Sequence, residues 1–216
     1  SEMCIRDRTM VNVNSNGPLN TNYMKRIQAT LNKSLREYHR TMALRIDLRL
    51  PDDSPYEKDP ILITRFIESL KSQKNADQLK KISLGKRTHH CRIRYVWVRE
   101  FNKNGKKHYH LVLFFNKDTY AYPGSYKPDH EGKYHHNLAY MIMEAWVRAL
   151  KLQKEDNYQK HYKLIHFPEN CYAHLNRYSS TYLEDYENVI NRLSYLAKEY
   201  SKDSSDNQRN IGCSQY

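Results

Sequence analysis

Two periods of hydrophobic and polar residues alternate along this chain, and they predict where helices and strands lie. Residues 22–38 repeat apolar side chains every three or four positions, which predicts a helix. Residues 42–51, MALRIDLRLP, alternate strictly, which predicts a half-buried strand that Pro51 ends. The expected apolar face of this strand carries Leu44, Ile46, Leu48 and Leu50, and the polar face carries Arg45, Asp47 and Arg49.

A hairpin is predicted in the middle of the chain. Residues 91–100 and 107–115 are rich in β-branched and aromatic side chains, as strands are. The sequence FNKNGK between them contains Asn-Gly, a strong signal for a tight turn between antiparallel strands. Residues 117–135, which are polar and contain several tyrosines and histidines, are expected to form a loop.

The remaining periodic segments predict three helices and one short strand. Residues 61–74 predict a helix followed by a polar, lysine-rich connection. Residues 137–152 predict a strongly apolar helix, residues 163–167 a strand, and residues 181–200 an amphipathic helix. Strands and helices therefore interleave, and we expect an α/β (α+β) fold with a central antiparallel sheet flanked by helices.

The sequence predicts one main domain between two terminal segments. Residues 1–20 begin with a string that is typical of translated adapter sequence and continue as a polar segment, so we expect a disordered or artefactual arm. A helix at 21–40, a main domain at 41–202 and a C-terminal tail at 203–216 complete the expected organisation. A chain of 216 residues is long enough for one domain without disulfides.

Charge and cysteine usage narrow the expected setting. The chain has 36 Lys and Arg against 24 Asp and Glu, which gives a formal charge of +12. This excess favours a protein that binds nucleic acid, and the alternative is a generically basic protein without such a partner. Its four cysteines lack metal-ligand spacing and are expected to be reduced thiols in the cytoplasm. No run of about 18 apolar residues and no leader is present, so neither a membrane nor export is expected.

The sequence KHYHLVLFF places His108 and His110 on the same face of its predicted strand. The hairpin turn brings Glu100 alongside on the neighbouring strand, so that two imidazoles and one carboxylate can reach one cation. This ligand set suits Mg²⁺ or Mn²⁺. The alternative is a chance pair of histidines among the 11 of this chain, each serving only as a satisfied polar residue.

A candidate nucleophile lies in the last predicted helix. In SYLAKEY, Tyr195 and Lys198 are three residues apart and would share one helical face. Tyr195 falls nearly opposite the apolar stripe centred on Leu193, so the helix would have to pack at an edge of the sheet for Tyr195 to face the histidines. The alternative is an exposed tyrosine beside a solvated lysine.

Several ordered segments resemble a known family. YVWVREFNKNGKKHYHLVLFFNKDTY, MIMEAWVRALKL, LIHFPENCY, RLSYLAK and RNIGCSQ resemble, in this order, blocks of the filamentous-phage (inovirus) gene-two replication proteins, whose prophage relatives are the YagK/YfjJ proteins. The resemblance covers roughly residues 40 to 215. That family resembles the HUH endonucleases, which implies an HUH-type nuclease domain at 41–202 with an RRM-like sheet.

The resemblance also implies roles for the candidate residues. His108 and His110 match the His-hydrophobic-His motif, and Tyr195 and Lys198 match the YxxK motif of single-tyrosine members. Glu100 resembles the acidic third ligand of some replication initiators. Tyr200 lies five residues after Tyr195, which does not match the same-face pair of two-tyrosine members, so a single nucleophile is expected.

The implied activity is that of a rolling-circle replication initiator, which nicks and rejoins DNA through a 5′-phosphotyrosine. Expected partners are single-stranded or supercoiled phage or plasmid origin DNA in a bacterial cytoplasm, with a host helicase as a further candidate. Arg45, Arg49, Arg94 and Arg99 are candidate DNA contacts, although charged strand faces are often only solvated. The alternatives are a catalytically inactive prophage-derived DNA-binding protein and, with less support in so short a chain, a relaxase or transposase.

Overall fold

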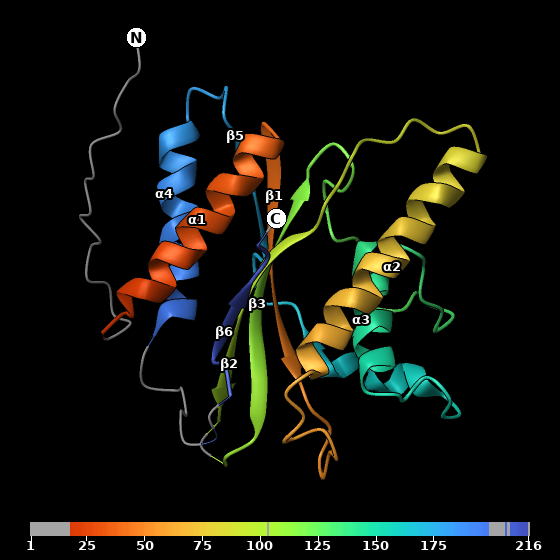
Figure 1. Ribbon diagram of the computed structural model, residues 1–216. Coiled ribbons are helices and arrows are strands. Elements are labelled where there is room, and N and C mark those ends of the chain that lie inside the picture. Colours follow the sequence, from red (N-terminus) through yellow and green to blue (C-terminus); the bar gives the residue numbers. More distant parts are fainter. Residues whose placement is uncertain (1–17, 103, 199–205, 207, 216) are drawn as a thin grey trace.

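The chain folds into a six-stranded antiparallel sheet with helices on both faces, as a computed structural model shows for residues 18–102, 104–198, 206 and 208–215 (Figure 1). The strands are β1 (Arg40–Arg49), β2 (Arg94–Phe101), β3 (Lys107–Asn116), β4 (Ile165–His166), β5 (Tyr172–Asn176) and β6 (Ile211–Cys213). The helices are α1 (Thr21–Glu37), α2 (Leu62–Ser83), α3 (Leu138–Ala149) and α4 (Tyr182–Leu193), with the 3-10 helices η1 (Tyr158–Leu164) and η2 (Ser194–Ala197). The predicted fold class is confirmed.

Two layers of helices cover the sheet, whose strand order is β4-β1-β3-β2-β6, with β5 also paired to β1. Helices α1 and α4 lie on one face, and α2 and α3 lie on the other (Figure 1). Strand β1 keeps the predicted alternation, but the expectation that it is only half buried is wrong. Its second face is covered as well, because Ala43 packs under the α1/α4 layer and Asp47 is only 7% exposed.

The predicted hairpin forms as β2 and β3, joined by a tight turn. Gly105 has a φ of +72°, a conformation that glycine adopts without a steric penalty. Side chains alternate along β3, so Tyr109 and Leu111 enter the core under α2 and α3, whereas Val112 and Phe114 enter the core under α1 and α4. This alternation fixes which face of the sheet each side chain of the hairpin occupies.

Helix α3 forms where the apolar pattern predicts it and packs on the sheet, with the buried Trp146 donating a hydrogen bond to the Arg49 carbonyl at 2.8 Å. Helix α2 is longer than predicted, because the polar segment expected to be a connection continues the helix to Ser83. Lysine, glutamine, alanine and leucine favour helix even on exposed faces. An ion pair of 2.6 Å between Asp77 and Lys81, one turn apart, adds to this preference.

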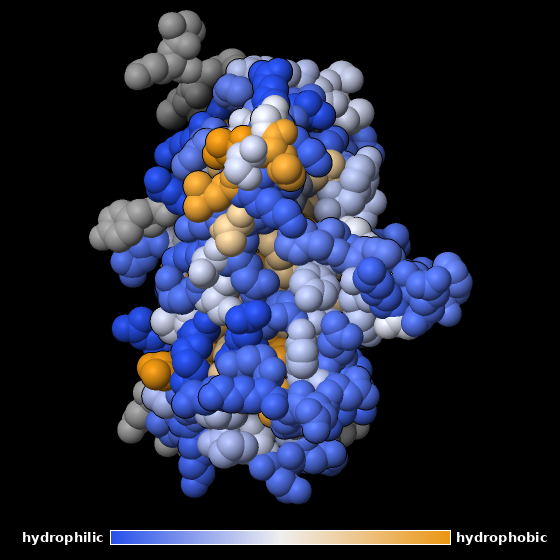
Figure 2. Space-filling view, turned by 90° about the vertical axis from the view of Figure 1, so that its right-hand side faces the viewer, coloured by the Kyte–Doolittle hydropathy of each residue, from blue (hydrophilic) through white to orange (hydrophobic). Residues whose placement is uncertain are grey.

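The face covered by α2 and α3 is mostly hydrophilic, and its most prominent apolar group lies over the C-terminal end of α2 (Figure 2). The exposed apolar residues there are Leu79, Ile82 and Leu84.

The last helix is shorter than predicted. Helix α4 ends at Leu193, residues Ser194–Ala197 form the 3-10 helix η2, and Lys198 is extended. Lys198 forms a β-bridge with Leu19, and the Asn20 amide donates to the Ala197 carbonyl at 2.7 Å, so η2 is anchored beside the start of α1. Tyr200 lies outside the described residues.

Short strands at the sheet edges were the least predictable elements. The expected strand at 163–167 is confirmed as β4 but contains only two residues, because η1 occupies the segment before it. Strands β5 and β6 were not predicted, and β6 adds residues near the C-terminus to the free edge of β2. Most of the expected arm at 1–20 lies outside the described residues.

Two further expectations concern thiols and membranes. Cys91, Cys171 and Cys213 are free, and Cys4 lies outside the described residues. In the part of the chain that the structure describes, no helix combines the length and apolar character needed to cross a bilayer.

Candidate active site

Three predicted ligands meet on the face of the β2–β3 hairpin below α1 and α4. Glu100 and His108 are direct partners in the strand register, and His110 lies two residues further along the same face. The Nε2 atom of His110 lies 3.3 Å from Glu100 Oε2 and 3.2 Å from His108 Nε2. One ligand atom from each of the three residues lies within 4.8 Å of the other two. We call Glu100, His108 and His110 the His–Glu cluster.

The His–Glu cluster lies where the sheet face changes from apolar to polar. Val112 and Phe114 continue the strand inward under the helices, whereas His108 and His110 lie toward the hairpin turn. A hollow of about 340 Å³ opens beside the cluster. Its lining includes both histidines, Asp47, Arg49, Asn102 and Lys106. The cluster is therefore mostly buried but can be reached from this hollow.

The environments of the two histidines shift their pKa values in opposite directions. Burial, together with the neighbouring His110, lowers the pKa of His108. Burial alone would also lower the pKa of His110, but hydrogen bonds with Asp47 and Glu100 outweigh it and raise that pKa. His108 is thus the histidine that more readily offers a neutral nitrogen to a cation.

Asp47 is a site residue that sequence reasoning missed. Its Oδ1 accepts a hydrogen bond of 2.5 Å from His110 Nδ1, and its Oδ2 accepts one of 3.2 Å from His166 Nδ1. A carboxylate on one imidazole nitrogen fixes the ring so that the other nitrogen faces a cation. Burial would raise the pKa of Asp47, but the hydrogen bond and charge of His110 hold it below its usual value. The signal was the pairing of Asp47 with His110 across β1 and β3, which the sequence alone does not give.

Tyr195 lies directly beside the His–Glu cluster. Its ring centroid is 5.3 Å from that of His110, and the two rings are nearly perpendicular at 88°. The predicted position opposite the apolar stripe assumed a continuous α-helix. Tyr195 instead lies in the 3-10 helix η2, where its ring packs against the same core cluster as Leu193. Helix α4 contacts the edge strand β5, as the sequence led us to expect, and η2 then carries Tyr195 to the histidines.

Two cations flank the Tyr195 ring. Lys198 Nζ lies 4.0 Å from the ring centroid, and the guanidinium carbon of Arg45 lies 4.3 Å from it. Lys198 is buried, and Arg45 also approaches Asp47 Oδ1 at 3.8 Å. The predicted tyrosine and lysine are therefore close together, and Arg45 joins them from β1.

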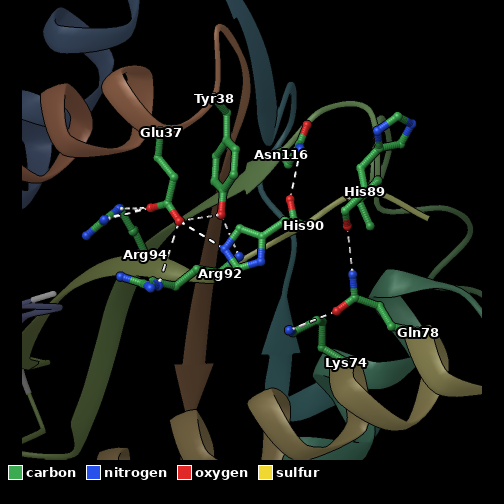
Figure 3. Close-up of polar contacts among 10 residues, drawn as sticks. Glu37, Tyr38, Lys74, Gln78, His89, His90, Arg92, Arg94 and Asn116 are labelled. Atoms are coloured by element: carbon green, nitrogen blue, oxygen red, sulfur yellow. Dashed lines mark hydrogen bonds and ion pairs between the residues drawn. The ribbon is translucent and has the colours of Figure 1, made fainter.

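The four candidate DNA-contact arginines separate into two groups. Arg45 and Arg49 lie at the site, with Arg49 exposed in the hollow. The interpretation of Arg94 and Arg99 as DNA contacts is corrected, because both are buried in internal ion pairs. Figure 3 shows Arg94 bonded to Glu37 at the end of α1, with a shortest distance of 2.6 Å.

Arg99 points to the opposite face of the sheet from the His–Glu cluster. It pairs in register with Tyr109, on the side of α2 and α3. Only 1% of it is exposed, and it donates to Asp206 at 2.5 Å and to Asn210 at 2.8 Å. Because neighbouring residues on a strand face opposite ways, Glu100 and Arg99 cannot both serve one site.

The donor atoms of the His–Glu cluster are of the types that bind a divalent cation. Two imidazole nitrogens and one carboxylate oxygen converge, and Asp47 orients one of the imidazoles from behind. Three protein ligands would leave further coordination positions for water or phosphate oxygens. A tyrosine hydroxyl carried on the adjacent ring provides a nucleophile type next to these ligands.

Comparison with known proteins identifies the family. Residues 5–214 match the YagK/YfjJ C-terminal domain. The chain is 36% identical over 201 residues to the uncharacterized protein YagK of Escherichia coli K12, covering 89% of this chain and 92% of that protein. It is 34% identical over 204 residues to the uncharacterized protein YfjJ of the same organism, covering 89% and 93%. No solved structure matches. The chain therefore belongs to the YagK/YfjJ C-terminal domain family.

Proposed function

We propose that this chain is a metal-dependent enzyme that nicks and rejoins single-stranded DNA through a covalent 5′-phosphotyrosine, as a rolling-circle replication initiator does. The observation that carries the proposal is the Tyr195 ring 5.3 Å from the ring of His110, a member of the His–Glu cluster. The sequence resemblance to the inovirus gene-two replication proteins supports the same reaction. The proposed substrate is phage or plasmid origin DNA, and the proposed setting is the bacterial cytoplasm.

Glu100, His108 and His110 would hold the cation, for which we propose Mn²⁺ or Mg²⁺. When bound, this cation supplies a Lewis acid that polarises a phosphate oxygen. Asp47 keeps the His110 ring oriented, and the exposed Arg49 supplies positive charge for a neighbouring phosphate of the strand.

Tyr195 carries out the bond exchange. A bond forms between its hydroxyl oxygen and phosphorus, and the bond between phosphorus and the 3′ oxygen breaks. The phenol proton passes to water and the departing 3′ oxygen takes up a proton, so the step needs no oxidant or reductant. Lys198 and Arg45 flank the ring, and their charges stabilise negative charge that develops on the reacting oxygens.

The phosphotyrosine retains the energy of the broken phosphodiester. The free 3′ hydroxyl can prime synthesis, and a later 3′ hydroxyl can attack the phosphotyrosine and restore a DNA phosphodiester. This second exchange releases Tyr195 and explains how rejoining proceeds without ATP.

Covalent capture tests the proposal. The full chain is incubated with Mn²⁺ and single-stranded oligonucleotides tiled across a cognate origin, and denaturing gels report a protein–DNA adduct. We expect Tyr195→Phe to abolish the adduct. We expect His108→Ala to slow its formation by about 100-fold, the scale of losing metal-ion polarisation. Tyr178→Phe is the matched control, because Tyr178 is an exposed tyrosine on the turn after β5, and it should leave the adduct unchanged.

An adduct that persists in Tyr195→Phe would refute the assignment of the nucleophile. DNA binding without any adduct, with Mn²⁺, Mg²⁺ and all tiles, would instead favour the catalytically inactive DNA-binding alternative.

A further inference from the structure

A second hollow, of about 440 Å³, lies on the other side of the sheet from the His–Glu cluster. It is formed by the C-terminal end of α2, residues 119–122 and the start of α3. Figure 2 looks onto the molecule from the side of α2 and α3. The proposed nicking reaction uses none of the residues that line it.

This hollow is basic. Lys80, Lys81 and Lys86 line it, and Asp77 is its single acidic residue among the described ones. Asp77 is already neutralised, because it pairs with Lys81 at 2.6 Å and also bonds to Tyr120 and His136. Lys80 and Lys86 are exposed, and no acidic residue occurs in the sequence between Asp77 and Glu100. The free charge in the hollow is therefore positive and suits phosphate groups.

An exposed aromatic cluster adjoins the basic hollow. Tyr122 lines the hollow and is 61% exposed. Its ring centroid lies 5.7 Å from that of Tyr172 and 5.5 Å from that of His174, both on β5. His174 is fixed by its hydrogen bond to the Ala121 carbonyl at 2.6 Å, and Tyr172 is 37% exposed. Rings kept at the surface in this way can stack against the faces of unpaired bases.

We propose that this hollow and the adjoining Tyr122, Tyr172 and His174 bind single-stranded DNA. Lys80 and Lys86 contact phosphates, and Tyr122 and Tyr172 stack with bases. Lysines combined with exposed aromatic rings recognise single strands without sequence preference, because every base has a flat face and every nucleotide a phosphate. The inference rests on the proposed function for the identity of its ligand, and adds a second contact for the strand that is nicked.

The sheet edge connects this surface with the candidate active site. Tyr172 pairs with Leu44 on β1. Asp47 lies three residues after Leu44 on this strand, and the rise of a β-strand places these two residues about 10 Å apart. His166 of β4 pairs with Asp47 at that edge. A strand leaving the active site can pass around the edge formed by β4 and β5 to reach Tyr172 and Tyr122.

Fluorescence anisotropy with a labelled oligothymidylate of about 16 nucleotides tests the proposal, since one such platform covers up to about that length. EDTA is present to prevent metal-assisted contacts at the His–Glu cluster. We expect Tyr122→Ala to weaken binding at least roughly fivefold, the lower end of what one stacked base contributes, and Tyr122→Trp to retain it. Tyr178→Ala, at a residue that is 76% exposed, is the control and should bind as the unmodified chain does.

Salt dependence tests the lysines separately. We expect Lys80→Gln with Lys86→Gln to lower the slope of log affinity against log salt by about 1.4, since each phosphate contact of a single strand contributes about 0.7. The control with equal charge change is Lys25→Gln with Lys154→Gln, at exposed residues elsewhere on the chain, and it should leave the slope near that of the unmodified chain.

Unchanged affinity in Tyr122→Ala, or equal weakening in Tyr178→Ala, would overturn the proposal. Inorganic polyphosphate that competes as well as unlabelled oligothymidylate would also overturn it, because charge alone would then explain binding. The assay needs neither Tyr195 nor a cation. A chain that forms no covalent adduct but loses oligothymidylate binding in Tyr122→Ala would therefore refute the proposed nicking while supporting this surface.

Discussion

Asp47 provides the sharpest test of how single residues prepare the candidate active site. Its carboxylate holds His110 Nδ1 at 2.5 Å, which leaves Nε2 directed at His108 and Glu100. We expect Asp47→Asn to weaken Mn²⁺ binding by about 10-fold to about 100-fold, as loss of such an outer carboxylate does elsewhere. Isothermal titration calorimetry measures this affinity.

Asp118→Asn is the control for Asp47→Asn, because Asp118 pairs with Arg40 at the opposite end of β1. Equal Mn²⁺ affinity in Asp47→Asn and the unmodified chain would show that Asp47 does not orient a ligand.

The raised pKa of His110 predicts a dependence of Mn²⁺ affinity on pH. A proton competes with the cation for this imidazole, and the competition extends above the ordinary histidine value of 6.5. Mn²⁺ affinity should therefore rise as the pH increases through the folded pKa of His110, and Asp47→Asn should move this rise to lower pH. Titrations between about pH 6 and about pH 9 measure it, and a flat profile would contradict the account.

The raised pKa of His110 has the opposite effect on the stability of the metal-free fold, which decreases as the pH rises. A histidine whose folded pKa is raised stabilises the fold fully below 6.5, and this stabilisation is lost as the pH rises through the folded pKa.

Local patterns were sufficient for part of the site. Alternation placed His108 and His110 on one face, and the Asn-Gly turn fixed the register that brings Glu100 to them. The role of Asp47 depends on the pairing of β1 with β3 across some sixty residues, which no local pattern encodes. Arg99 was wrongly assigned to the site although a local pattern was available. Applying the same alternation to β2 places Arg99 on the face opposite Glu100 and would have excluded it.

At the scale of elements, the end of α4 decides where Tyr195 points. Helical periodicity continues through the sequence to residue 200, so the change to a 3-10 helix at Ser194 was not predicted. Contacts between η2 and residues 19–20 fix this geometry. They depend on the start of α1 lying beside the end of α4, which is a property of the tertiary fold.

The junction between α1 and β2 supports a prediction about stability. Glu37 ends α1 and bonds to the buried Arg94 at 2.6 and 3.0 Å, with His90 at 3.2 Å from the same carboxylate (Figure 3). We expect Glu37→Gln to lower the free energy of unfolding by about 1 to about 3 kcal/mol, because Arg94 loses its charged partner. Urea unfolding measures this, and Glu68→Gln, which removes an exposed pair with Lys71, should change it by less than about 0.5 kcal/mol.

Acid should remove the contribution of Glu37. Burial would raise the pKa of Glu37, but the hydrogen bond from Arg94 outweighs it and lowers that pKa below the ordinary value of 4.5. A carboxyl with a lowered folded pKa stabilises the fold above 4.5, and this stabilisation is lost as the pH falls through the folded value. If the unmodified chain and Glu37→Gln lost stability identically between about pH 5 and about pH 2, Glu37 would not be a source of the acid sensitivity.

At the scale of the whole molecule, the sheet separates two surfaces with different chemistry. The His–Glu cluster and Tyr195 lie on the side of α1 and α4, and the basic hollow with Tyr122 lies toward α2 and α3. The sequence predicted the sheet and both helix layers, because these elements carry long periodic patterns. It did not predict β5 and β6, which have five and three residues and form only through pairing with β1 and β2.

The central claim is that Tyr195 becomes covalently joined to DNA at a cation held by the His–Glu cluster. Mass spectrometry of the protease-digested adduct, formed with Mn²⁺ and origin DNA, tests it most directly by locating the nucleotide on one residue. The account predicts a 5′-phosphonucleotide on Tyr195, and none when EDTA replaces Mn²⁺. A nucleotide mapped to another tyrosine, or the same yield on Tyr195 in EDTA, would contradict it.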